Sequence, residues 1–126
     1  MLYQKILLID DDEDDQEIFL TALECTKKPV SCTVLDSARK ALNQIAQGEL
    51  ETDLIFLDLN MPLMNGQQFL TEIKKDEKLR QIPVIILSTS SNAATVSQVK
   101  QLGARYFFTK PGRFEDLVAI LEKVLM

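Results

Sequence analysis

Three carboxylates, a hydroxyl and an ammonium stand just after short apolar runs of the sequence. They belong to Asp10, Asp11, Asp58, Ser88 and Lys110. If these runs are parallel strands, their carboxyl ends meet at one edge of a sheet, where open α/β sheets bind their ligands. Clustered carboxylates beside a hydroxyl and an ammonium are suited to a metal ion and a phosphoryl group. The sequence therefore predicts a site of this kind.

The carboxylates would be crowded. Two carboxylates about 5 Å apart repel each other by about 3 kcal/mol at an effective dielectric constant of about 20. Three of them stay ionised together only if a cation is present, or else a pKa rises. Mg²⁺ fits such a site, because it takes one or two carboxylates and phosphate oxygens and keeps several waters. For the acidic residues 12–15 we expect a simpler role, the favourable interaction of negative charge with a helix N-terminus.

The elements that would carry these residues follow from the apolar pattern. Strands are predicted at residues 5–9, 32–35, 54–57, 84–87 and 106–108. The first, third and fourth are almost entirely apolar, which is typical of strands covered on both faces. The second mixes polar and apolar residues and fits an edge strand.

Helical patterns fill the intervals, the first over about residues 13–26 and the fourth following Ser91 or Asn92. Ser37 is expected to cap the second helix, and the third is expected to start near Asn65 and Gly66. The stripes expected to face the sheet are Ile18, Phe19, Ala22 and Leu23; Ala38, Ala41, Leu42 and Ile45; Phe69, Leu70 and Ile73; Val96, Val99 and Leu102; and Phe114, Leu117, Val118, Leu121, Val124 and Leu125. Five βα units without a gap predict an α/β, doubly wound (βα)₅ fold with a five-stranded parallel sheet.

Length and composition narrow the function. The 126 residues suit one domain, and the net charge of -5 argues against direct binding of nucleic acid. No apolar run approaches the roughly 20 residues that span a bilayer, and no signal-peptide pattern is present, so we expect a cytoplasmic protein. The absence of histidine excludes histidine catalysis and a phosphohistidine within this chain. Cys25 and Cys32 are expected to be plain buried thiols.

The motifs together resemble the receiver domain of two-component response regulators. The resemblance rests on the run ending in Asp10 and Asp11, on Asp-x-x-Met-Pro-x-x-x-Gly at 58–66, on Ser88 and on the Lys110-Pro111 pair. It covers residues 1–126, in the right order and spacing. It implies a flavodoxin-like strand order 2-1-3-4-5 and a single receiver domain of the stand-alone type, without an output domain.

The resemblance also implies roles for single residues. Asp58 would accept the phosphoryl group, and Lys110 would pair with the phosphoryl oxygens. Asp11 would bind Mg²⁺ directly and Asp10 mainly through water, while Asp58 and the backbone carbonyl of Asn60 would complete the protein ligands. No other cofactor is implied.

Two further positions would transmit the signal. Ser88 would be the switch hydroxyl, where threonine is commoner, and Phe107 the switch aromatic, where tyrosine is commoner. Phe107 lacks a hydroxyl, so an output that needs one at this position is excluded. Asn60 and Ser90 would tune the lifetime of the phosphate.

The function implied is a phosphoacceptor switch. A histidine kinase, a phosphotransfer protein or a small phosphodonor would supply the phosphoryl group, and Mg²⁺ would support its transfer to Asp58. The fourth helix, fifth strand and fifth helix would change for a protein partner, and a dimer through that face is left open. We expect no enzymatic activity beyond phosphorylation and dephosphorylation of the chain itself.

Three alternatives remain. A degenerate receiver would act as an interaction module without phosphorylation, but it would be expected to lack one of the residues kept here. A phosphatase could use Asp58 as a nucleophile, although no segment for a substrate pocket is visible. A flavodoxin-like cofactor binder is disfavoured, because the acidic residues 10–15 would repel a phosphate. The bond between Lys110 and Pro111 also raises the question of cis geometry.

Overall fold

A single parallel sheet forms the centre of the protein. The computed structural model describes residues 3–89 and 92–125. Its five strands lie in the order β2-β1-β3-β4-β5, which confirms the predicted fold class and strand order. Their bounds are β1 (Lys5–Ile9), β2 (Ser31–Leu35), β3 (Leu54–Leu57), β4 (Val84–Ser88) and β5 (Tyr106–Thr109).

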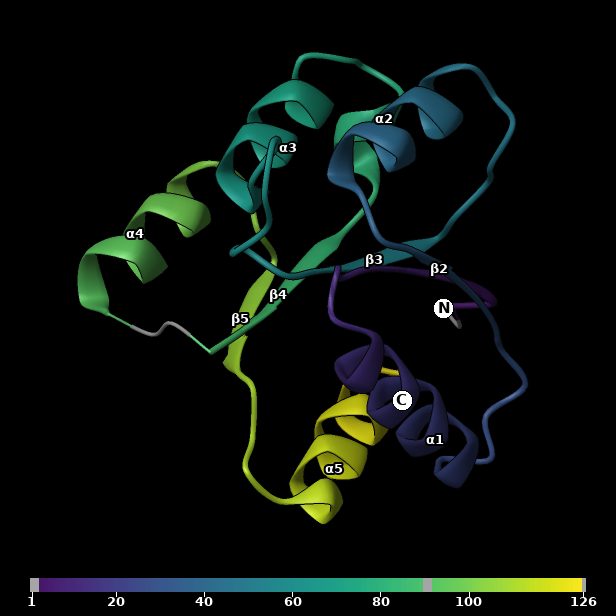
Figure 1. Ribbon diagram of the computed structural model, residues 1–126. Helices are drawn as coiled ribbons and strands as arrows, with labels where there is room; N and C mark the ends of the chain where they lie inside the picture. Colours follow the sequence, from purple (N-terminus) through teal and green to yellow (C-terminus); the bar gives the residue numbers. More distant parts are fainter. Residues whose placement is uncertain (1–2, 90–91, 126) are drawn as a thin grey trace.

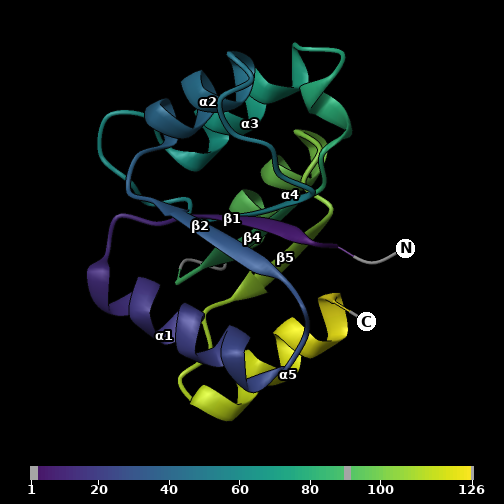
Figure 2. The same cartoon turned by 90° about the vertical axis from the view of Figure 1, so that its right-hand side faces the viewer.

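Helices cover the sheet on both faces. They are α1 (Glu13–Cys25), α2 (Ala38–Ala46), α3 (Gly66–Lys74), α4 (Ala93–Gln101) and α5 (Phe114–Val124), with a short 3₁₀ helix at Leu79–Gln81. α2, α3 and α4 lie on one face, and α1 and α5 lie on the other (Figures 1 and 2). Side chains of Asp12, Ser37, Asn65 and Asn92 accept a backbone N–H three residues on, which fixes four of the helix starts.

The strand residues alternate between two apolar layers. Leu7 and Ile9 pack with residues of α2 and α3, whereas Ile6 and Leu8 pack with residues of α1 and α5. Every residue of β3 and β4 is buried, as expected for strands covered on both faces. The partly exposed β2 lies at an edge, as predicted. The strand ends that carry the polar residues are therefore held by a rigid core.

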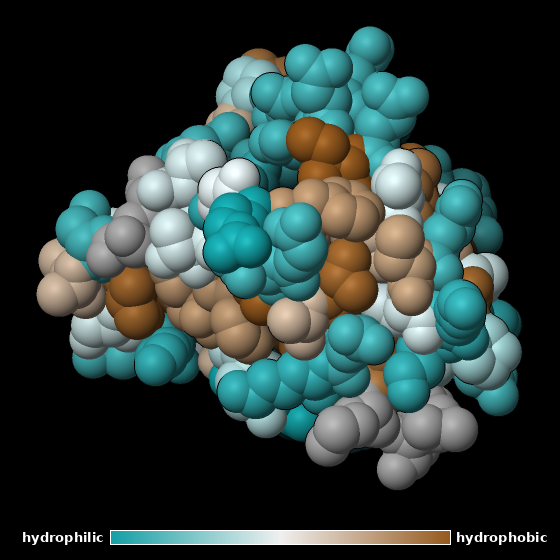
Figure 3. Space-filling model, turned by 90° about the horizontal axis from the view of Figure 1, so that it is seen from below, coloured by the Kyte–Doolittle hydropathy of each residue, from teal (hydrophilic) through white to brown (hydrophobic). Residues whose placement is uncertain are grey.

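Some expectations about burial were wrong. Ile18 is 46% exposed and Phe114 is 39% exposed, because the apolar stripes of α1 and α5 are narrower than predicted. Apolar side chains are visible among polar ones on the side of α1 and α5 (Figure 3). Cys25 is exposed and Cys32 is half-buried, because Cys25 lies at the end of α1 and Cys32 on the edge strand. In α4 only Val99 is buried, as its thin stripe suggested.

Two other questions are answered by the backbone. The bond between Lys110 and Pro111 is trans, since the described residues contain no cis peptide bond. Among residues 3–89 and 92–125, no helix has both the length and the apolar character to cross a bilayer.

Candidate functional site

Neighbouring strands bring Asp10 and Asp58 side by side. Ile9 of β1 pairs with Leu57 of β3, so the next residue of each strand lies at the same edge of the sheet. The backbone N–H of Asp58 donates to the carbonyl of Ile9 at 3.0 Å. Both aspartates are buried, because the sheet and its helices surround them.

Asp11 completes a group of three carboxylates. One carboxylate oxygen from each of Asp10, Asp11 and Asp58 lies within 4.8 Å of the others, and Asp11 is exposed to solvent. The Asp12 N–H donates to Asp10 Oδ1 at 3.0 Å, and the Lys110 ammonium donates to Asp10 Oδ2 at 2.9 Å. The corresponding contacts of Asp58 are longer, at 3.4 Å from the Asn60 nitrogen to Oδ1 and 3.8 Å from Lys110 Nζ to Oδ2. Three carboxylates are suitable ligands for a hard divalent ion, and Asp10 is the least available of them as a direct ligand.

Lys110 reaches the carboxylates from the end of β5. Its backbone N–H donates to the carbonyl of Ser88 at 2.8 Å, which continues the pairing of β5 with β4. Its Nζ atom lies 2.9 Å from Asp10 Oδ2, 2.8 Å from Asp15 Oδ2 and 3.8 Å from Asp58 Oδ2. The lysine side chain is only 15% exposed. It therefore contributes a shielded positive charge to the site.

Burial controls the charges of the site. Burial raises the pKa of Asp58 to about 6; Asp10 and Asp11 add to the rise, and Lys110 opposes it. Burial lowers the pKa of Lys110, but its hydrogen bonds to Asp15 and Asp10 outweigh this and raise the pKa overall. Lys110 is thus charged at neutral pH, and an added cation would favour the ionised form of Asp58.

The predicted switch residues lie on neighbouring strands. Ser88 is fully buried at the end of β4, and its register partner is Thr109. Phe107 is half-buried, pairs with Ile86, and packs against the apolar layer that contains Val99 of α4. Phe107 therefore links β5 to the apolar layer that α4 covers.

A tight loop follows Asp58 and holds its carboxylate. The Asn60 N–H donates to Asp58 Oδ1 at 3.4 Å, and the Gly66 N–H donates to the Leu59 carbonyl at 3.1 Å. A Cβ atom on Gly66 would lie 2.8 Å from Leu59 Cα, so this close approach requires glycine. Leu63, at the tip of the loop, has a φ of 68° and is 97% exposed. Ser90 lies outside the described residues.

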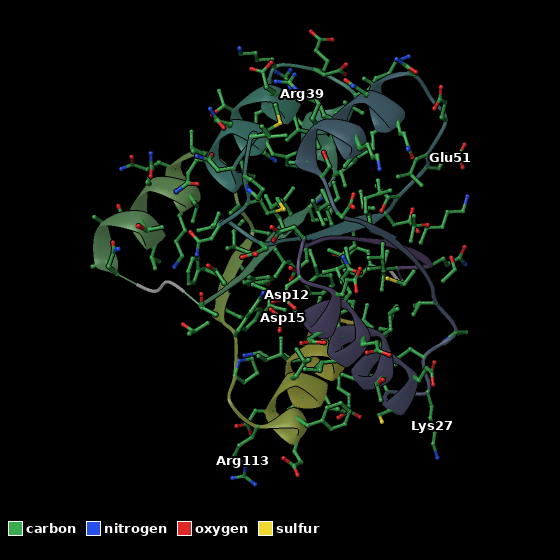
Figure 4. All side chains as sticks on the ribbon, viewed as in Figure 1. Asp12, Asp15, Lys27, Arg39, Glu51 and Arg113 are labelled. Atoms are coloured by element: carbon green, nitrogen blue, oxygen red, sulfur yellow. The ribbon has the colours of Figure 1, made fainter. Side chains whose placement is uncertain are left out.

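Asp15 is a site residue that the sequence did not indicate. It lies in the first turn of α1, where an acidic residue was expected only to favour the helix N-terminus. Figure 4 shows Asp12 and Asp15 at that end of the helix, and the carboxylate of Asp15 reaches Lys110. Because the two residues are 95 positions apart, no local pattern could have revealed the pair.

Known proteins are similar to this chain in sequence. The chain is 31% identical over 120 residues to the two-component response regulator ORR11 of rice, covering 95% of this chain and 80% of the relative. It is 31% identical over 124 residues to the response regulator Rcp1 of Synechocystis, covering 94% and 84%.

Solved structures of response regulators have a similar fold. The phosphorylated cyanobacterial phytochrome response regulator RcpA aligns with a TM-score of 0.85 and 31% identity, covering 97% of this chain and 91% of that one. The Mn²⁺-bound form of Rcp1 aligns with a TM-score of 0.84 and 28% identity, covering 96% and 91%. A family model described as the response regulator receiver domain matches residues 6–122, and the chain therefore belongs to this family.

Proposed function

We propose that the protein is a phosphoacceptor switch whose acceptor is Asp58. The observation that carries the proposal is the buried Asp58 carboxylate, 3.8 Å from the Lys110 ammonium and within 4.8 Å of two more carboxylates. Family membership supports a histidine kinase or a phosphotransfer protein as the source of the phosphoryl group. The similar protein RcpA has been solved in its phosphorylated form, which supports phosphorylation of this chain.

The transfer would use the geometry of the site. An Asp58 oxygen attacks phosphorus as the bond from phosphorus to the donor's imidazole nitrogen breaks, and the electron pair of that bond leaves with the imidazole. Lys110 then pairs with the phosphoryl oxygens, and the buried position of Asp58 limits access of other nucleophiles. Water later hydrolyses the aspartyl phosphate.

Asp11, Asp58 and, mainly through water, Asp10 would hold a divalent ion, with the Asn60 carbonyl as a further ligand. When bound, Mg²⁺ would neutralise charge that develops on the phosphoryl oxygens. The similar protein Rcp1 has been solved in a Mn²⁺-bound form, which supports divalent ion binding by this chain.

The face formed by α4, β5 and α5 would carry the output. α4 buries only Val99, so it is the helix whose packing is easiest to shift. A recess of about 410 Å³ on this side includes Tyr106, Phe108 and Val124 among its lining residues.

The charge around this recess indicates what kind of partner would bind. Lys100, Arg105 and Lys123 also line it and form no ion pair among the described residues, although the protein carries a net charge of -5. We therefore expect a partner segment with acidic residues beside an apolar or aromatic side chain. A dimer through this face is a second way to cover it.

Phosphorylation itself is the decisive test. The protein would be treated with acetyl phosphate and Mg²⁺ and its intact mass measured, beside Asp58→Asn. Wild type should gain one phosphate and Asp58→Asn none. Equal labelling of both would defeat the assignment, and an unlabelled wild type would favour the degenerate receiver. Turnover of unrelated phosphate esters would instead favour the phosphatase alternative.

A further inference from the structure

We infer that Asp15 is a positioning residue that holds Lys110 back from Asp58 and thereby opposes the phosphorylated state. The inference rests on the proposed function, since it concerns how easily Lys110 leaves Asp15 to pair with a phosphoryl group on Asp58. It gives a role to an acidic residue that lies outside the three-carboxylate group.

The geometry shows a lysine shared between competing carboxylates. An ammonium has three N–H donors. In Lys110 two of them serve Asp15 at 2.8 Å and Asp10 at 2.9 Å, whereas the contact with Asp58 at 3.8 Å is too long for a hydrogen bond. Two of the three N–H groups of Lys110 are therefore already hydrogen-bonded before any phosphoryl group arrives.

Of the two partners, Asp15 is the one that can release the lysine at lower cost. The side chain of Asp10 is only 4% exposed, so loss of the ammonium would leave a buried charge uncompensated. The side chain of Asp15 is 37% exposed, so water can replace the ammonium around it. The Asp15 N–H donates to the Asp12 side chain at 3.1 Å, which keeps the helix start in place whatever the Asp15 side chain does.

Lys110 must therefore break mainly its ion pair with Asp15 in order to pair with the phosphoryl oxygens. Removing the Asp15 carboxylate should make that transfer easier and favour the phosphorylated form. The same change should weaken Mg²⁺ binding in the free protein, because the released ammonium can move towards Asp58, a ligand of the ion. Opposite effects on the two ligands distinguish this role from a structural one, which would weaken both.

The test compares three variants of the 126-residue chain. Asp15→Asn keeps the size of the side chain and removes its charge, and Asp15→Glu keeps the charge. Asp14→Asn is the matched control, because it removes the same charge from the neighbouring, exposed position, which forms no ion pair with Lys110. Calorimetry would give the affinity for Mg²⁺ alone and the affinity for beryllium fluoride in saturating Mg²⁺, and intact mass would follow loss of phosphate.

Asp15→Asn should bind beryllium fluoride about threefold more tightly than Asp14→Asn, as expected for one partly exposed ion pair. It should also bind Mg²⁺ more weakly and lose phosphate more slowly, while Asp15→Glu should resemble wild type. If wild type is labelled but Asp15→Asn behaves like Asp14→Asn, or binds both ligands more weakly, the inference is wrong and the proposed function stands. If wild type takes no phosphate, both fail.

Discussion

The ammonium of Lys110 lies 3.8 Å from the carboxylate of Asp58. This is about 1 Å longer than a charge-assisted hydrogen bond between such groups. The Asp58 carboxylate is therefore close to a positive charge without being neutralised by it. The raised pKa of Asp58 agrees with this, because burial outweighs the attraction of Lys110.

Lys110→Ala should separate phosphorylation from its consequences. The variant should still be labelled on Asp58, but a phosphoryl group would lack its partner, so the conformational response should be lost. Without Mg²⁺ the free energy of unfolding should fall by about 2 kcal/mol, because Asp10 loses its ammonium inside the protein. Urea unfolding and intact mass would measure the two effects. An unfolded circular dichroism spectrum would instead assign Lys110 a structural role.

The stability of the metal-free protein should depend on the ionisation of Asp58. Its pKa of about 6 in the folded state is above the ordinary value of 3.8, so the ionised carboxylate disfavours folding. The penalty is complete above pH 6, decreases as the pH falls, and vanishes below the ordinary pKa. In EDTA at pH 8, Asp58→Asn should therefore unfold with a free energy about 3 kcal/mol higher than wild type. A difference that does not shrink between pH 7 and pH 4 would contradict this.

Mg²⁺ affinity should depend most on Asp11 and Asp58. Asp10 already accepts from the Asp12 N–H and from Lys110, so its substitution should matter less. In a calorimetric titration, Asp11→Ala should lower the affinity at least about tenfold, as loss of one charged ligand costs more than about 1.4 kcal/mol. Asp12→Asn serves as the control, since its side chain caps α1. Unchanged binding by Asp11→Ala would remove it from the ligand set.

Gly66→Ala should disturb the loop that joins Asp58 to α3. The new Cβ would lie 2.5 Å from Leu59 Cδ2 and 2.8 Å from Leu59 Cα, so the backbone beside Asp58 must shift. We expect a loss of about 2 kcal/mol in the free energy of unfolding and slower labelling. Gly112→Ala is the control, because nothing lies within 4 Å of its added Cβ. Equal stability of the two variants would mean that the loop adapts without cost.

The response to phosphorylation should appear in the region of α4 and β5. Amide exchange would be compared with and without beryllium fluoride, both in Mg²⁺. Beyond the residues around the site, the changes should gather in residues 92–112, because Phe107 links β5 to the layer containing Val99. Changes confined to α1 and α2 would place the output face elsewhere.

The sequence predicted β1, β3, β4 and β5 well because each contains a short apolar run, and the resemblance supplied the strand order. Asp10, Asp11, Asp58 and Lys110 could be predicted to lie together, because strand ends meet at one edge of a parallel sheet. The exposure of Ile18 could not be predicted, since the periodicity of a helix does not fix how wide a stripe its neighbours cover. The pair of Asp15 and Lys110 depends on where the first turn of α1 lies beside β5, which only the folded chain determines.

The contact between Asp10 and Lys110 joins residues 100 positions apart, which directly follow β1 and β5. The site therefore exists only when the whole sheet has formed, and a chain that lacks β5 has no such site. By mass action, a ligand that binds only the assembled site stabilises the folded state. The melting temperature should therefore rise as Mg²⁺ and beryllium fluoride occupy the site and fall when they are removed.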